Sequence, residues 1–124
     1  MGSSYLLVTI NGAITLMTTQ NAKTKCGSEC PVRKTASILD GKWTTLIIRD
    51  LLPGKKRYSE LLKSLEGISP KMLAARLTFL EANRVVSKKI YPVVPPKTEY
   101  QLTALGRSLS DVIAAMAVFG EKIR

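Results

Sequence analysis

The fold is decided by one stretch of the chain, which reads Ile68-Ser69-Pro70-Lys71-Met72-Leu73-Ala74-Ala75-Arg76-Leu77-Thr78-Phe79-Leu80-Glu81. Ser69 is a good helix N-cap, and Pro70 suits the first helical position, where its missing N–H leaves no intrahelical bond unmade. Leucines at i, i+4 and i+7 form one apolar stripe: Leu73, Leu77 and Leu80. The pattern predicts an amphipathic helix over residues 69–83.

The face of this helix opposite the leucines is small and nearly uncharged. It carries Ala75, Thr78 and Ala82 with a single cation, Lys71. A solvated helix face in a chain rich in Lys and Arg would normally hold more charge. Small side chains let a helix approach a flat surface closely, and hydroxyl and ammonium groups bond to phosphates or base edges. We interpret the stretch as a DNA-recognition helix; the alternative is an ordinary core helix with an alanine-rich exposed face.

The composition restricts the possible functions. The 124 residues suffice for one domain with a core, and 19 Lys and Arg against 9 Asp and Glu give a formal charge of +10. Such an excess favours a polyanionic partner, either nucleic acid or an anionic membrane surface. The sequence has no histidine, which removes the usual general base and the commonest zinc ligand. It therefore argues against an enzyme and predicts no cofactor and no metal.

Two elements flank the candidate recognition helix. Residues 59–65 predict a short helix, and a glycine-containing turn over residues 66–68 completes a helix-turn-helix. After it, the apolar period changes to that of strands over residues 85–91 and 98–102, and the prolines between them exclude regular structure. The pattern is typical of a winged helix whose hairpin carries Lys88, Lys89 and Lys97 near its tip. The alternative role of these lysines is to keep an edge strand soluble.

The N-terminal part divides into an arm and two helices. Residues 1–22 carry no charged side chain, and their apolar run of about 13 residues is too short to span a membrane. Asn11-Gly12 between two β-rich runs predicts a hairpin, which should pack on the body or on a partner subunit. A disordered or vector-derived extension is the alternative. Helices are predicted from Pro31 to Asp40-Gly41 and over residues 42–52.

A final helix is predicted over residues 103–124, with Thr103 as its cap. Its apolar stripe is wide, and one small domain offers too little surface to cover it. We expect the same helix of a second subunit to cover it in a two-fold homodimer; the alternative is a helix lying across its own domain. The residues expected at the dimer interface are Leu105, Leu109, Val112, Ile113, Met116, Phe119 and Ile123.

Short motifs in the chain resemble those of the HxlR-type winged helix-turn-helix regulators, relatives of the MarR group, in matching order from about Cys30 to the C-terminus. They are Cys30-Pro31-Val32, Gly41-Lys42-Trp43, Arg57-Tyr58-Ser59-Glu60-Leu61, the run 67–73, Arg76-Leu77, Leu80-Glu81, Tyr91-Pro92 with Pro95-Pro96, Glu99-Tyr100 and Leu102-Thr103 with Gly106. The resemblance implies a homodimeric transcription factor that binds a pseudo-palindromic operator in double-stranded DNA.

The expected fold is α+β and mainly α: a winged helix-turn-helix domain over residues 26–124, including the dimerisation helix, preceded by an N-terminal arm over residues 1–25. The chain departs from the family in two places. The family usually has glycine just after the recognition helix, where this chain has Asn83-Arg84, and asparagine tolerates the left-handed conformation nearly as well. The hydrophobic arm is also longer than expected, so the resemblance implies no role for it.

Each subunit is expected to place residues 69–78 in a major groove, with two such helices about one helical turn of DNA, or a multiple of it, apart. The residues expected nearest the bases are Ser69, Lys71, Met72, Ala75 and Thr78, with Pro70 at the helix start. Arg76 lies beside the apolar stripe, which favours a phosphate contact or an internal ion pair. Further backbone contacts are expected from Lys55, Lys56, Arg57, Lys88, Lys89 and Lys97.

The two cysteines are a candidate redox sensor. Cys30 matches the cysteine that several redox- or electrophile-responsive members of the family use. It precedes Pro31 at a predicted helix N-terminus, where the helix dipole and the neighbouring Arg33 and Lys34 favour the thiolate. Cys26 would then resolve a sulfenic acid as a disulfide. The alternative is a half-buried structural cysteine. Two cysteines in a DNA-binding protein fit the reducing cytoplasm.

Three other functions compete with a redox-switched regulator. The first is a non-specific, architectural DNA-binding winged helix, and the second is a winged helix used for protein–protein contact, which the positive charge disfavours. The third is a regulator that senses a small molecule in an apolar pocket at the dimer interface. The sequence does not predict the operator or the inducing signal.

Overall fold

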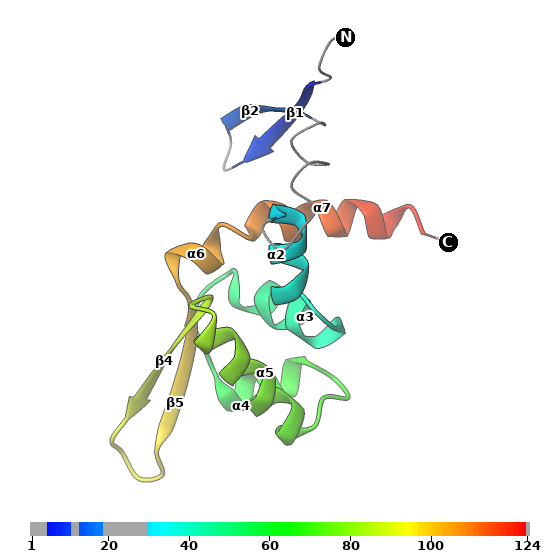
Figure 1. Cartoon of the computed structure of the whole chain (residues 1–124). Coiled ribbons are helices and arrows are strands. Elements are labelled where there is room, and N and C mark those ends of the chain that lie inside the picture. Colours follow the sequence, from blue (N-terminus) through cyan, green and yellow to red (C-terminus); the bar gives the residue numbers. More distant parts are fainter. Residues whose placement is uncertain (1–4, 11–12, 19–29, 124) are drawn as a thin grey trace. The chain divides into compact units, whose positions relative to one another are not determined.

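The computed structural model describes residues 5–10, 13–18 and 30–123, which belong to two compact units, residues 1–40 and 41–124. In the first unit, β1 (Tyr5–Ile10) and β2 (Ala13–Thr18) pair antiparallel, and α2 spans Pro31–Ile38 (Figure 1). The paired strands agree with the predicted hairpin. The turn residues 11–12 and the domain boundary expected after residue 25 lie outside the described residues, so that boundary stays a prediction.

The second unit contains the predicted winged helix. Its elements are α3 (Lys42–Leu51), β3 (Lys56–Arg57), α4 (Tyr58–Ser64), α5 (Pro70–Ala82), β4 (Val86–Tyr91), β5 (Lys97–Leu102), α6 (Ala104–Arg107) and α7 (Ser110–Glu121). Figure 1 shows the β4–β5 hairpin extending beyond the helices as the wing. The mainly helical α+β fold predicted from the sequence is therefore confirmed. Within the described part of the chain, no helix combines the length and the apolar character needed to cross a bilayer.

The core of this unit lies between the helices and the inner face of the sheet. The leucine stripe of α5 is fully buried, as its spacing predicted, and each fully buried leucine contributes roughly 1.5–3 kcal/mol to stability. The other buried apolar residues of this unit come from α3, α4, the strands and the positions next to them: Ile47, Ile48, Leu51, Leu61, Leu65, Val85, Val86, Tyr100 and Leu102. The inner face thus holds α5 in place and leaves its outer face exposed.

The sheet has three antiparallel strands in the order β3-β5-β4, and β3 was not predicted. Its two residues, Lys56 and Arg57, pair with Tyr100 and Glu99 of β5. Two charged residues show no apolar alternation, so nothing local marks them as a strand. Only the register of β5 brings them into the sheet. The short strand joins the wing to the start of the helix-turn-helix, because α4 begins directly after it.

The end of α5 differs from the expectation at Asn83. The left-handed residue is Arg84, with φ +61°, whereas Asn83 has φ −90° and donates its side-chain N–H to the Phe79 carbonyl at 2.8 Å. The amides of Arg84 and Val85 bond to the carbonyls of Glu81 and Leu80, at 3.0 Å each. These two bonds define a Schellman motif, in which the residue after the C-cap takes the left-handed conformation.

The single helix predicted over residues 103–124 is wrong, because the structure has two helices. Thr103 caps α6 as expected, accepting a bond from the Gly106 amide at 3.1 Å. At Ser108 and Leu109 the ψ angles are close to zero, and the Leu109 amide bonds to the Gly106 carbonyl three residues back. Such i→i−3 bonding tightens the turn and interrupts the α-helical ladder. A Cβ on Gly106 would collide with the Val85 carbonyl, so α6 approaches the backbone at Val85 more closely than a residue with a side chain would allow.

Candidate nucleic-acid interface

The helix-turn-helix is formed by α4, a tight turn and α5. The turn depends on Gly67, whose backbone angle φ of +92° is rarely adopted by residues that have a Cβ. The Ile68 amide closes it on the Leu65 carbonyl at 3.1 Å. Ser69 then caps α5 as predicted, its hydroxyl accepting a bond from the Met72 amide at 3.1 Å. The start of the candidate recognition helix is therefore fixed by local bonds.

A second contact fixes the same helix end from outside. The hydroxyl of Tyr58, the first residue of α4, donates to the carbonyl of Pro70, the first residue of α5, at 3.0 Å. This bond ties together the N-terminal ends of the two helices. Sequence reasoning placed Tyr58 only in a family motif and gave it no role, since a bond between residues 12 positions apart has no local signal.

The outer face of α5 is open, as expected for a helix that binds a ligand. Six of the seven predicted contact residues on it are exposed, and the exception is the half-buried Arg76. Met72 is the large apolar side chain of this face, at 36% exposure. The exposed six are Ser69, Pro70, Lys71, Met72, Ala75 and Thr78. They lie together on one surface, and their contact with DNA stays a prediction.

Five of the six predicted phosphate-binding cations divide between the faces of the small sheet. The register pairs Lys89 with Glu99 and Lys97 with Tyr91, so these four side chains share one face, here called the outer face. Lys88 and Lys56 are both paired with the buried Tyr100 and belong to the opposite face. Arg57, which is paired with Glu99, belongs to the outer face, and Lys55 precedes the strand. All of these cations except the half-buried Lys56 are exposed.

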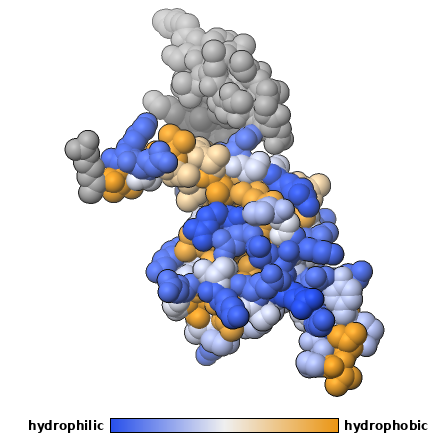
Figure 2. All heavy atoms as spheres, turned by 180° about the vertical axis from the view of Figure 1, so that it is seen from behind, coloured by the Kyte–Doolittle hydropathy of each residue, from blue (hydrophilic) through white to orange (hydrophobic). Residues whose placement is uncertain are grey.

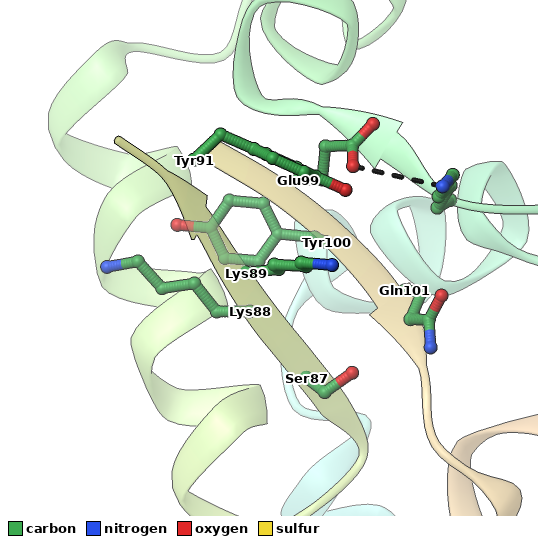
Figure 3. A pocket seen from close by; sticks show the side chains of 8 residues that line it. Ser87, Lys88, Lys89, Tyr91, Glu99, Tyr100 and Gln101 are labelled. Carbon is green, nitrogen blue, oxygen red and sulfur yellow. Dashed lines mark ion pairs between the residues drawn. The ribbon is translucent and has the colours of Figure 1, made fainter. Parts of the chain in front are cut away.

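One acidic side chain stands among the cations of the outer face. Glu99 lies 3.9 Å from the Lys55 ammonium (Oε1 to Nζ), and its side chain is only 17% exposed (Figure 3). Lys89 stands over the Tyr91 ring, with its ammonium 4.9 Å from the ring centre. Together with Ser87, Gln101 and their neighbours, these residues line a polar pocket on the wing. Sequence reasoning did not identify Glu99 or Tyr91 as part of the site.

The electrostatics of this face centre on a hydrogen bond from the Tyr91 hydroxyl to the Glu99 carboxylate. The bond raises the pKa of Tyr91, because it favours the protonated phenol; the desolvation of Tyr91 and the negative charge of Glu99 act in the same direction. The same bond, with the charges of Lys55, Arg57 and Lys89, lowers the pKa of Glu99. At neutral pH the carboxylate is therefore ionised and the phenol is protonated.

The predicted dimer interface on α6 and α7 is largely exposed. Phe119 and Ile123 are 65% and 66% exposed, and Leu105 and Met116 are 55% and 45% exposed. Leu109, Val112 and Ile113 are half-buried, and α7 packs against α3. Figure 2 shows hydrophobic side chains along this helix and at the tip of the wing, where Val94 is fully exposed. Exposed apolar residues in this number are typical of an interaction surface, and the two-fold homodimer stays a prediction.

The candidate redox residues are described only in part. Cys30 is the N-cap residue of α2, followed by Pro31, as the sequence predicted, and its side chain is 2% exposed. Arg33 and Lys34 in the first turn are exposed. Cys26 lies outside the described residues. An oxidant would have to reach a buried sulfur, which requires a local opening around Cys30.

Comparisons with known proteins agree with this geometry. The model of the family described as HxlR-like helix-turn-helix matches residues 38–124. The HTH-type transcriptional regulator sll1512 of Synechocystis sp. is 40% identical over 108 residues, which are 86% of this chain and 80% of that protein.

Two solved structures are similar over most of the chain. A MarR-family transcriptional regulator from Porphyromonas gingivalis is 45% identical, with a TM-score of 0.76 over 79% of this chain and 96% of that one. The redox regulator HypR in its oxidised form is 38% identical, with a TM-score of 0.71 over 77% and 98%. Family, fold and relatives agree, and none of them points to an enzyme. The chain belongs to the HxlR-like helix-turn-helix family of transcriptional regulators, which bind DNA.

Proposed function

We propose that this regulator binds a pseudo-palindromic operator as a homodimer, with α5 of each subunit in a major groove. The observation that carries the proposal is the open outer face of α5, whose exposed residues lie over a fully buried leucine stripe. A rigid helix with small outward side chains fits the width of the groove. The exposed cations Lys55, Arg57, Lys88, Lys89 and Lys97 would contact the flanking phosphates.

The exposed apolar side chains of α6 and α7 support the homodimer. Two-fold pairing of this surface would bury Leu105, Met116 and Phe119 against the second subunit. It would also set the distance between the two recognition helices, and hence half-sites about one helical turn, on the order of 34–36 Å, or a multiple of it apart. A regulator that binds a small molecule at this interface is the variant that the same surface allows.

The proposal is tested by titrating the reduced protein onto a duplex selected from a random pool and onto a scrambled duplex of equal composition. Selective binding is expected, and Lys71→Ala should weaken it at the cognate base pairs by roughly 1–3 kcal/mol. Lys97→Ala should instead weaken binding to both duplexes and reduce the salt slope by about one. Equal, steeply salt-dependent binding to both duplexes would favour the architectural alternative.

We also propose that oxidation at Cys30 modulates DNA binding. Two observations support this proposal: the 38% identity to the redox regulator HypR, and the position of Cys30 at a helix N-terminus. An oxidant such as a peroxide would convert the thiolate to a sulfenic acid, and the Cys26 thiol would displace water from it to form a disulfide. Diamide should change the affinity of the wild type and leave Cys30→Ser unchanged. Selective binding that oxidant does not change in either protein would contradict the redox switch and leave the proposal of a sequence-specific regulator intact.

A further inference from the structure

The acidic residue of the wing occupies an unexpected position for a surface that binds DNA. Glu99 is the only acidic residue between Glu81 and Asp111, and its carboxylate would repel phosphates. It nevertheless stands at the centre of the outer face, among the side chains Lys55, Arg57, Lys89 and Tyr91, which together with Glu99 are called the wing-base cluster.

The cluster connects three strands through one carboxylate. Arg57 of β3 and Lys89 of β4 are the direct cross-strand neighbours of Glu99, and such neighbours on one face lie close enough to interact. Lys55 pairs with the same carboxylate at 3.9 Å, and Tyr91 donates a hydrogen bond to it. Lys89 in turn lies over the Tyr91 ring. Lys55 and Lys89 are therefore held by Glu99 or by its partner Tyr91, and Arg57 lies beside Glu99 in the register of the sheet.

The cluster also links the wing to the helix-turn-helix. Arg57 directly precedes α4, and its amide donates to the Glu60 carboxylate at 2.9 Å. The next residue, Tyr58, holds the first residue of α5 through its hydroxyl. A shift of the wing base would therefore be transmitted over two residues to the start of the recognition helix.

We propose that Glu99 is a positioning residue for operator binding, which holds the cations of the wing base in one arrangement relative to α5. This proposal rests on the proposed function. Phosphate contacts carry no sequence information, but they fix the register of a protein on the duplex. Cations fixed by Glu99 fit the phosphates only when α5 meets its own base pairs. Cations released from it adapt to any duplex, so Glu99 favours the operator over other DNA.

The test compares wild type, Glu99→Gln, Tyr91→Phe and the matched control Glu66→Gln, which adds the same charge at an exposed position in the turn before α5. Glu99→Gln should raise affinity for scrambled DNA about fivefold at physiological salt, as one added phosphate contact does. Its ratio of operator to scrambled affinity should fall on the order of tenfold, the size of one lost base contact. Glu66→Gln should raise both affinities equally and keep the ratio.

Tyr91→Phe separates positioning from charge, because it removes the hydrogen bond to Glu99 without changing the net charge. The ratio of operator to scrambled affinity should fall several-fold in Tyr91→Phe, while the salt dependence of binding stays that of the wild type. In the double variant Tyr91→Phe/Glu99→Gln this ratio should fall no further than in Glu99→Gln alone. Thermal unfolding of each variant separates these effects from a loss of folded protein, which would lower both affinities in proportion.

A selective wild type whose ratio is unchanged in Glu99→Gln and Tyr91→Phe would overturn this proposal alone. Equal gains for operator and scrambled DNA in Glu99→Gln would also overturn it, because Glu99 would then act only as a counter-charge. A wild type that does not discriminate between the duplexes would overturn the proposed function and this proposal with it.

Discussion

The left-handed residue at the end of α5 allows a sharp test of the backbone conformation there. Arg84 has φ +61°, a conformation that costs residues with a Cβ about 1–2 kcal/mol. Glycine adopts it freely but loses about 0.5–1 kcal/mol more through the entropy of the unfolded chain. The Arg84 side chain is exposed, so its removal sacrifices little packing. Arg84→Gly should therefore stabilise the protein by about 0.5–1 kcal/mol, the difference between the two effects.

The matched control is the neighbouring residue. Asn83 has φ −90° and bonds to the Phe79 carbonyl at 2.8 Å, so Asn83→Gly gains no relief and loses a helix-capping bond. It should destabilise the protein by about 1 kcal/mol. Urea unfolding of wild type and both variants, followed by circular dichroism, measures the two changes. Opposite signs are expected; stabilisation by Asn83→Gly with destabilisation by Arg84→Gly would refute the assignment of the left-handed position to Arg84.

Three further predictions concern single contacts. Gly106→Ala should cost about 1–3 kcal/mol or more in urea unfolding, because the new Cβ meets a backbone carbonyl that cannot rotate away; an unchanged midpoint would contradict the close approach. Ser69→Ala should cost about 1 kcal/mol through loss of the cap on the Met72 amide, whereas Ser69→Asp should retain stability in the same assay. The Tyr91–Glu99 bond needs a protonated phenol and an ionised carboxylate, so its stabilisation should be full between the ordinary pKa values of 4.5 and 10.0. This stabilisation should fade as pH falls through the lowered pKa of Glu99 or rises through the raised pKa of Tyr91. A difference in unfolding free energy between wild type and Tyr91→Phe that does not change with pH would contradict the prediction.

The sequence predicted those parts of the fold whose signals are local. Ser69, Pro70 and the leucines at i, i+4 and i+7 specify the start and the inner face of α5, and the structure has both. The change of apolar period after residue 84 likewise predicted the wing strands, whose observed bounds differ by a single residue. Local pattern succeeds here because capping, helical spacing and strand alternation act over a few residues.

The errors come from interactions between distant segments. The strand β3 exists because β5 pairs with Lys56 and Arg57, and the interruption between α6 and α7 accompanies the close approach of Gly106 to Val85. Neither partner is visible from the local sequence. The exposed residues of α5, whose spacing is local, were placed correctly. The cations of the wing-base cluster were predicted as phosphate contacts, but their grouping around Glu99 and Tyr91 was missed. The members of this cluster come from the three strands and from Lys55 just before β3, and the register of the sheet brings them together.

The most direct measurement of the central claim is a hydroxyl-radical footprint of the reduced, full-length protein on its selected duplex. We expect two equivalent protected regions related by a two-fold axis, with centres about one helical turn or a multiple of it apart. Phe119→Glu, which places a charge in the exposed apolar face of α7, should abolish the paired footprint and leave only weak binding. A single protected region in the wild type, or uniform protection along the duplex, would contradict a dimeric, sequence-specific regulator.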